Sequence, residues 1–405
     1  MGNPSDQLHG KSIAVTIKNF WAEAHIVGGV ASPLDYSDVS GKAVLPHLRL
    51  IPNPIFDQFN FSDLSNLSEN ISTEGYSGGM RLMQATCKRF FEYCTTSGHS
   101  GLAAAIRSLD GGCGVGGFSL TYHTNITRQV GLAGSSAIIV SILKCLLQLY
   151  GIQIVSSTTD STPTTPTHPS MSHADLASLA LSVEVMELGI HAGLMDRVSQ
   201  VYEGLVAMDF SKDVMEAETA QASLALVDGG DNERVDGNSP KMGGGAMQRG
   251  RYERLPMSVL PATGGILLAY ARDPSDSGKI HANVKERWMR GDVEVLEAAK
   301  TWAGFVDEAL DVLRSQSSFS QFLPERFCQL VDENFDLRFK IYGEECLGWK
   351  NVRMIKIARG HNAAGKFCGS GGAIIVLPRP TTDVKALQEA MGAEGFVLVP
   401  LLPIA

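Results

Sequence analysis

A glycine- and serine-rich turn between a strand pattern and a long apolar helix constrains the fold of this chain most strongly. The turn, QVGLAGSSA, covers residues 129–137 and is called the phosphate loop below. Gly131 and Gly134 allow the backbone to turn tightly and to approach a ligand closely. Ser135 and Ser136 stand where the helix begins, and the N–H groups of a first helical turn are unpaired and favour an anion.

The phosphate loop therefore predicts a phosphate site. The hydroxyl of Ser136 is placed to reach a Mg²⁺ that bridges phosphate oxygens, which is the role of Ser or Thr in other nucleotide-binding loops. The alternative from the residues alone is an ordinary helix cap without a ligand.

The composition indicates which partners to exclude. The formal net charge is −9 and the chain has no basic cluster, so a nucleic-acid partner is not expected. Its seven cysteines are scattered without disulfide or zinc spacing, which fits a reduced cytoplasmic protein. The apolar runs are too short to cross a bilayer and no signal peptide opens the chain, so we expect no membrane partner.

Several strings in the chain resemble the motifs of the GHMP kinases, the family of galactokinase, homoserine kinase and mevalonate kinase. The second family motif is similar to NITRQVGLAGSSAI at residues 125–138. The other matching strings are GNPSD at 2–6, LGIHAGLMDRVSQVYEGL at 188–205, DPSDSGK at 273–279 and KFCGSGGAIIV at 366–376. Within the family, these strings together are most similar to the plant-type glucuronokinases.

The resemblance implies an α+β fold of two domains. The expected N-terminal domain, residues 1–212, is ribosomal-protein-S5-like, with inserts near 99–117 and 156–172. The expected C-terminal domain, residues 255–405, is ferredoxin-like, and residues 213–254 are expected to form a mobile insert and linker. The family's first strand, which carries an Arg or Lys directed at the reacting oxygen, would lie upstream of the first residue of this chain.

Local patterns add expectations about single elements. Residues 31–61 and 99–117 lack a clear periodicity and read as loops, and the Ser-, Thr- and Pro-rich residues 156–172 read as disordered. Apolar residues recur at helical spacing in six segments of the chain. These expected helices are 80–95, 280–289, 293–313, 325–341, 352–359 and 383–391.

Two acids stand on either side of a pair of glycines. On one continuous helix, Glu184 and Asp196 would lie about 18 Å apart and could not share one phosphate. Gly189 and Gly193 break that helix, so both acids can converge on the phosphate loop. The resemblance implies that Glu184 binds Mg²⁺ together with Ser136, and that Asp196 is the catalytic base. From the residues alone, a helix cap at Asp196 and a solvated Glu184 remain the alternative.

The resemblance also implies an ATP site made of two glycine-rich loops. A second loop, GSGG at 369–372, matches the third family motif and is called the glycine loop below; as an alternative it is only a hairpin turn. GHNAAGK at 360–366 imitates a Walker A loop, but Phe367 stands where Ser or Thr must bind Mg²⁺, so we reject it. The residues expected to bind ATP are Gly131, Leu132, Ala133, Gly134, Ser135, Ser136, Ala137, Gly369, Ser370 and Gly371.

Five residues are candidates for contact with a sugar acid. Asp6 falls on the Asp of the first family motif, although from the residues alone an Asx turn after Pro4 is the favoured interpretation. Arg128 is the first choice and Arg81 the second for a forked pair with a substrate carboxylate. Tyr76 is expected to line the sugar pocket beside Arg81, and Lys279 to contact phosphate or sugar. The simpler alternatives are an exposed arginine in the first helical turn at Arg81 and a plain surface charge at Lys279.

The resemblance implies transfer of the γ-phosphate of ATP, with Mg²⁺, to the anomeric hydroxyl of D-glucuronate. A related sugar-1-kinase for galacturonate, galactose or arabinose is one alternative. A catalytically weak sugar-binding regulator on the same fold is the other. The sequence makes no prediction of the oligomeric state.

Overall fold

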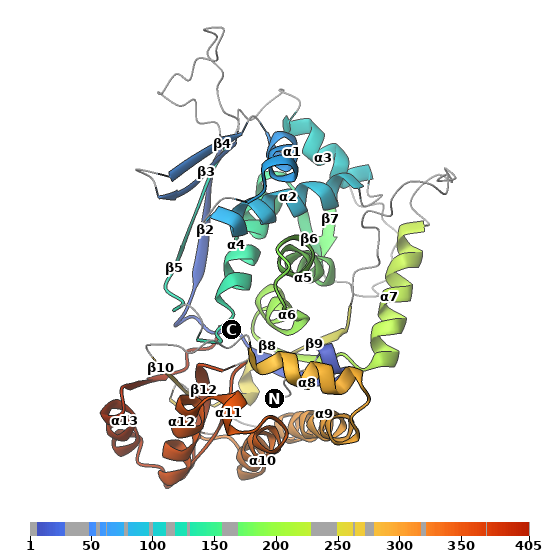
Figure 1. Ribbon diagram of the computed structural model, residues 1–405. Helices are drawn as coiled ribbons and strands as arrows, with labels where there is room; N and C mark the ends of the chain where they lie inside the picture. The colour runs from blue at the N-terminus through green and yellow to red at the C-terminus, as the bar shows by residue number, and fades with distance from the viewer. Residues whose placement is uncertain are drawn as a thin grey trace.

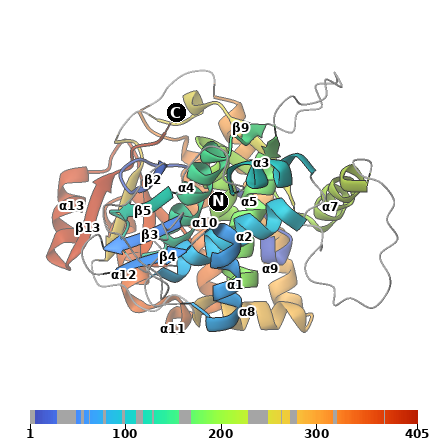
Figure 2. The same cartoon turned by 90° about the horizontal axis from the view of Figure 1, so that it is seen from above.

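Helices and sheets mix throughout the protein, as the expected α+β class requires (Figures 1 and 2). The C-terminal half, orange to red in Figure 1, packs beneath the N-terminal half. The computed structural model describes residues 6–28, 48–53, 57–61, 63–76, 80–96, 100–110, 118–127, 130–155, 169–227, 249–261, 264–271, 279–316, 321–369 and 371–404.

The N-terminal half is built on a sheet of four strands in the order β2-β5-β3-β4. Strands β2 and β5 are antiparallel, whereas β3 and β5 are parallel. Helix α4 packs on β2 and β5, and its apolar residues Ile139, Leu143 and Leu146 are fully buried. The four strands are β2 (Ala22–Gly28), β3 (Leu48–Asn53), β4 (Asp57–Phe61) and β5 (Phe118–Thr124).

Helices bury the apolar side of α4 and form one core with it. A π-helical turn (Val183–Glu187) continues α5, and the chain then bends before α6 begins. The helices of this half are α1 (Leu64–Glu74), α2 (Arg81–Thr96), α3 (Ser100–Asp110), α4 (Gly134–Leu149), α5 (His173–Ser182) and α6 (Leu194–Tyr202). A parallel pair of short strands, β6 (Gln153–Val155) and β7 (Ser170–Ser172), lies beside them.

A second sheet joins the two halves. Its order is β1-β8-β9, and both pairs are antiparallel. Helix α9 of the C-terminal half contacts β1, and Leu205 of this sheet shares a core with Val306 of α9. The elements are β1 (Lys11–Val15), β8 (Leu205–Asp209) and β9 (Arg251–Leu255), with α7 (Lys212–Val227) between β8 and β9.

The C-terminal half has an antiparallel sheet of four strands in the order β11-β12-β10-β13. Helices α10, α12 and α13 contact the sheet. The strands are β10 (Leu267–Ala271), β11 (Ala363–Phe367), β12 (Ala373–Pro378) and β13 (Phe396–Pro400). The helices are α8 (Lys279–Met289), α9 (Val293–Arg314), α10 (Glu325–Tyr342), α11 (Glu344–Leu347), α12 (Trp349–Gly360) and α13 (Val384–Ala393).

Three loop expectations were wrong. Strands β3 and β4 lie within residues 31–61, and helix α3 occupies most of residues 99–117. Leu102 and Ile106 of α3 are buried at an i, i+4 spacing, so this small Ala- and Gly-rich helix is held by its apolar face. Residues 213–227 of the expected mobile insert belong to α7, and β9 completes the second sheet at the end of the expected linker.

The expected disordered segment falls largely outside the described residues, which resume at residue 169 and enter β7. The expected long helices of the C-terminal half are confirmed within one to three residues. Within the described residues, none of the helices is both long and apolar enough to span a lipid bilayer.

Candidate active site

The phosphate loop turns sharply before α4. Ala133 is the N-cap residue of α4 with a left-handed backbone (φ 56°), and Gly131 also has a positive φ of 69°. Helix α4 then begins at Gly134, so the N–H groups of its first turn point out of the helix end. The hydroxyl of Ser136 donates to the carbonyl of Ala133 at 3.0 Å and helps to close the turn. The loop therefore presents a cluster of backbone donors.

The glycine loop packs directly against the phosphate loop. A Cβ atom at Gly131 would lie 2.2 Å from the carbonyl oxygen of Gly371, closer than any side chain can come. A Cβ atom at Gly369 would lie 3.2 Å from the carbonyl oxygen of Gly131. Glycine is thus required at Gly131 by both its backbone angle and its neighbour. The two loops that the family resemblance placed side by side are neighbours in the structure.

Glu184 and Asp196 are linked through an arginine that the sequence analysis missed. Arg197 forms an ion pair with Glu184 and lies 3.6 Å from a carboxylate oxygen of Asp196. Its Nη1 also donates to the carbonyl of Gly193 at 2.9 Å, which ties the arginine to the bend before α6. The side chains of Glu184 and Arg197 are both buried, and burial lowers the pKa of Arg197 to about 10. The bend at the glycines therefore brings both acids close to one arginine.

The serine that contacts Glu184 is Ser135 and not Ser136. The Ser135 hydroxyl donates to a Glu184 carboxylate oxygen at 2.7 Å, whereas the buried Ser136 hydroxyl bonds to Ala133. The expected joint binding of Mg²⁺ by Ser136 and Glu184 stays a prediction, and the direct contact of Ser135 with Glu184 makes Ser135 a second candidate ligand. The phase of α4 explains which serine makes this contact: consecutive residues of a helix point about 100° apart, so only one of two adjacent serines can face Glu184.

Asp6 stands at the start of α6 beside Asp196. Its carboxylate accepts a hydrogen bond from the N–H of Leu194 at 2.8 Å, and it fills the space where a Cβ of Gly193 would be. Withdrawal from water and the nearby Asp6 charge raise the pKa of Asp196 to about 6. The pKa of Asp196 is therefore closer to neutral pH than that of an ordinary aspartate.

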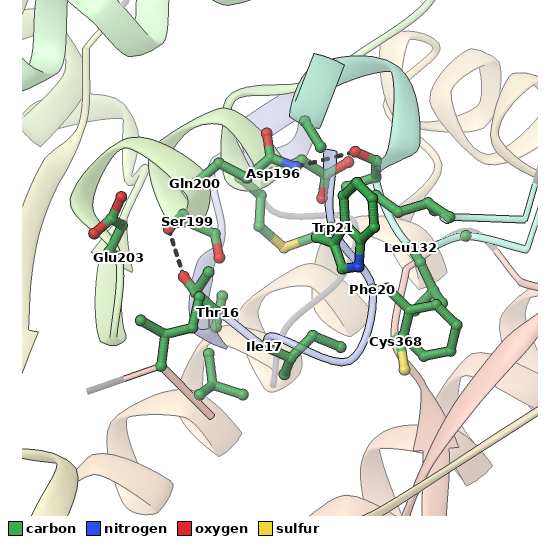
Figure 3. Close-up of a pocket in the computed structure, with 18 of the residues that line it drawn as sticks. Thr16, Ile17, Phe20, Trp21, Leu132, Asp196, Ser199, Gln200, Glu203 and Cys368 are labelled. Atoms are coloured by element: carbon green, nitrogen blue, oxygen red, sulfur yellow. Dashed lines mark hydrogen bonds between the residues drawn. The ribbon is translucent and has the colours of Figure 1, made fainter. Parts of the chain in front are cut away.

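Asp196 and part of the phosphate loop, residues 131–133 and Ala137, line one cavity of about 460 Å³ (Figure 3). Gly134, Ser135 and Ser136 are not among the residues that line it. Gln200 of α6 donates to the carbonyl of Ala133 at 3.0 Å and fixes this helix against the loop. The C-terminal sheet supplies part of another wall through residues 366–368. The polar or loop residues that line the cavity include Lys18, Gly131, Leu132, Ala133, Lys144, Asp196, Ser199, Gln200, Glu203, Lys366 and Cys368.

The candidates for sugar contact are less well placed. Tyr76 donates to Glu187, which also pairs with Lys88, and neither Tyr76 nor Arg81 lines the cavity. Arg81 is exposed on the first turn of α2, which supports the simpler interpretation of a solvated surface arginine. Arg128, Ser370 and the side chain of Lys279 lie outside the described residues.

The side chains near the phosphate loop supply only some of the ligands that a magnesium ion needs. Within the described residues, no three acidic, His or Cys side chains gather as a complete metal site. Magnesium in phosphate-transfer sites usually takes one or two carboxylates and completes its shell with water and phosphate oxygens. One carboxylate, Glu184, and one hydroxyl, Ser135, meet that requirement.

The sequence of this chain is similar to sequences of known kinases. A family model described as "GHMP kinases N terminal domain" matches residues 100–204. Glucuronokinase 1 of Arabidopsis thaliana is 35% identical over 402 residues, which cover 99% of this chain and 88% of that protein. Probable glucuronokinase 2 of the same plant is 36% identical over 403 residues, with the same coverage of both chains.

Solved structures resemble the fold at low sequence identity. The mevalonate kinase of Methanococcus jannaschii superposes with a TM-score of 0.59 at 14% identity, covering 98% of this chain and 92% of that chain. This similarity supports the arrangement of both halves of the chain.

Proposed function

We propose that this chain, which belongs to the GHMP kinase family, is a sugar-1-kinase that transfers the γ-phosphate of ATP to the anomeric hydroxyl of D-glucuronate. The choice of glucuronate is supported by the names of its two relatives from Arabidopsis thaliana, which are more than 30% identical over nearly the whole chain. The product would be glucuronate 1-phosphate, a precursor for UDP-glucuronate.

The observation that carries this proposal is that Asp196 lines the same cavity as Gly131 and Ala133 of the phosphate loop. A phosphoryl transfer needs a base and a polyphosphate cradle that face a common reacting atom. Asp196 and the loop meet this requirement because α6 is held against Ala133 by Gln200.

Asp196 would act as the general base. With a pKa of about 6 it is ionised at neutral pH, so it can accept the proton of the anomeric hydroxyl. An anomeric hydroxyl is more acidic than an ordinary alcohol, so a carboxylate of this strength is a sufficient base. Arg197 would hold the carboxylates of Asp196 and Glu184 in position, and Asp6 would bind a sugar hydroxyl nearby.

The phosphate loop would bind the polyphosphate of ATP. The N–H groups at the start of α4 are donors that favour the negative charge of the phosphates, and the neighbouring glycine loop would close over them. Ser135 and Glu184 would hold Mg²⁺, which when bound would neutralise charge on the phosphate oxygens. Arg128 and Lys279 stay candidates for contact with the sugar carboxylate and phosphate.

ATP consumption measured across a panel of sugars tests the proposal. D-glucuronate is expected to give the highest kcat/KM, followed by galacturonate, galactose and arabinose. The Asp196→Asn variant is the control for background hydrolysis. A higher kcat/KM with another sugar of the panel would reassign the substrate. The absence of turnover with every sugar would favour a sugar-binding regulator.

We place the enzyme in the cytoplasm. Its cysteines are scattered along the sequence without the spacing of a disulfide framework, and the six that the structure describes are free thiols. Localisation of a fluorescent fusion of the full-length protein tests this assignment, and a signal confined to an organelle would overturn it.

A further inference from the structure

A buried lysine lies on the cavity side of the C-terminal sheet. Lys366 of β11 pairs with Ile375 of β12, which pairs with Leu268 of β10, and all three line the cavity. Phe367 also reaches the cavity, but its ring packs on Phe335 of α10. Neighbouring residues of a strand face opposite sides, so the side chain of Lys366 lies on the other face of the sheet. Lys366 is therefore directed to the cavity by the pleat of the sheet and not by a flexible loop.

The surroundings of Lys366 leave its charge unbalanced. The side chain is only 3% exposed, and its Nζ donates to the carbonyl of Phe367 at 2.8 Å. An ammonium group has three donors, and among the described residues no carboxylate forms an ion pair with this one. Burial and the positive charge of Arg338 lower the pKa of Lys366 to about 8. Two like charges buried together are unfavourable until an anion joins them.

Arg338 adds a second buried cation behind the glycine loop. Its guanidinium stacks on the rings of Phe367 and Tyr342, and its Nη1 donates to the carbonyl of Gly369 at 3.0 Å. Its Nε and Nη2 atoms are buried with no hydrogen-bond partner among the described residues. The positive potential at the start of the glycine loop is therefore larger than Lys366 alone would create.

The two other lysines of the cavity differ from Lys366. Lys144 forms an ion pair with Glu203 at 2.5 Å, and Lys18 is exposed to water. Both have their charge compensated, one by a carboxylate and the other by solvent. Among the described lysines of the cavity, Lys366 is the one that lacks either compensation.

We propose that Lys366 binds an oxyanion of the ligand that occupies this cavity. The oxyanion is the carboxylate of the sugar acid or a phosphate of the nucleotide, and either would form a charge-assisted hydrogen bond with the buried ammonium. The assignment rests on the proposed function for the identity of these two ligands. It gives a role to the lysine that ends GHNAAGK, the string that imitates a Walker A loop.

The test measures binding separately from turnover. Calorimetry gives the affinities of D-glucuronate, of inorganic tripolyphosphate and of ATP for the wild-type protein and for the Lys366→Met variant. Methionine keeps the length of the side chain and removes the charge. We expect at least a tenfold loss of affinity for glucuronate or for tripolyphosphate, and the ligand that loses affinity identifies the source of the oxyanion. Lys366→Arg, which keeps the charge, is expected to retain part of the affinity.

Lys18→Met is the matched control, because Lys18 lines the same cavity but is exposed. Lys18→Met is expected to change the affinities for D-glucuronate, tripolyphosphate and ATP by no more than twofold. Thermal unfolding of the free proteins shows whether Lys366→Met is folded, and its Tm is expected to equal or exceed that of the wild type. Unchanged affinities in a folded Lys366→Met variant overturn the proposal. An equal loss of affinity in Lys366→Met and Lys18→Met also overturns it. If the wild type phosphorylates no sugar but binds tripolyphosphate through Lys366, the proposed function fails and this inference stands.

Discussion

Glu184 and Asp196, the two acids around the bend before α6, have different surroundings. We infer their different roles from these surroundings. Glu184 is buried against Arg197 and Ser135, so its charge is compensated inside the protein. Asp196 lines the cavity next to another carboxylate, Asp6, which favours its protonated form. Asp196 combines a place in the cavity wall with a pKa raised to about 6.

Replacement of Asp196 by asparagine is expected to lower kcat about 10²- to 10⁴-fold, the usual contribution of a general base. The amide keeps the shape of the side chain but cannot accept the proton. Steady-state kinetics with ATP and D-glucuronate measure the loss, and the KM for ATP is expected to stay within a few-fold. A variant with nearly full kcat would remove Asp196 from the chemistry.

The pH profile is expected to show the raised pKa of Asp196. Activity requires the ionised carboxylate, so kcat/KM is expected to fall as the pH drops through about 6. In Asp6→Asn a neighbouring negative charge is gone, the ionised form of Asp196 is less disfavoured, and the acid limb is expected to move to lower pH. An acid limb that stays in place in this variant would show that Asp6 does not act on Asp196.

The two serines of the phosphate loop give opposite expectations from sequence and structure. The structure predicts that Ser135→Ala, which loses the contact to Glu184, raises the Mg²⁺ concentration needed for half-maximal activity more than Ser136→Ala does. Titration of activity with Mg²⁺ compares the two variants. A larger effect of Ser136→Ala would support the assignment made from the sequence.

The spacing of the glycines showed that the two acids could meet, and the family resemblance singled them out, but neither predicted their neighbours. The glycines at Gly189 and Gly193 signalled a bend, and a bend brings Glu184 and Asp196 together. Arg197 was missed although it follows Asp196 directly, because a sequence does not show which way an arginine turns. The choice between Ser135 and Ser136 depends on the start of a helix, which sequence patterns place only within a few residues.

Among the elements, the two glycine-rich loops and helix α4 form the part of the site that depends on backbone geometry. The contact of Gly131 with Gly371 could be predicted only from the family motifs. No pattern within either loop shows that the two loops touch. Helix α3 was missed for a related reason. It is short and made of small residues, so its apolar face is narrow and packing on α2 determines it.

Gly131→Ala is expected to weaken ATP binding at least tenfold, because the new Cβ would push the two loops apart. Gly151→Ala is the matched control: its φ of 64° imposes similar backbone strain, but nothing lies within 4 Å of the added atom. The control is expected to lose about 1–2 kcal/mol of stability without a change in ATP affinity. Equal ATP affinities in the two variants would argue against a role for the loop contact.

At the scale of the whole molecule, the sheet β1-β8-β9 makes the two halves one structural unit. Leu205 of β8 and Val306 of α9 belong to one buried cluster, and Lys11 of β1 pairs with Asp307 of α9 at 2.8 Å. The sequence predicted two domains with a linker, and the boundaries of those domains stay a prediction. Contacts so distant in sequence leave no local pattern, so this shared core could not be predicted.

Leu205→Ala is expected to destabilise the protein by about 2–5 kcal/mol and to leave one cooperative unfolding transition. Circular dichroism and tryptophan fluorescence, followed together during denaturation, measure the effect. Val293→Ala on α9, where the valine is exposed, is expected to change stability by less than about 0.5 kcal/mol. Two separate transitions in the wild type would contradict a shared core.

Asp196 and the phosphate loop are proposed to face the sugar and the nucleotide from opposite sides of one site. A crystal structure with a non-hydrolysable ATP analogue and D-glucuronate tests it most directly. The polyphosphate is expected on the N–H groups at the start of α4, with the anomeric oxygen about 2.6–3.2 Å from the Asp196 carboxylate. A nucleotide bound elsewhere, or a sugar whose anomeric oxygen lies out of reach of Asp196, would contradict it.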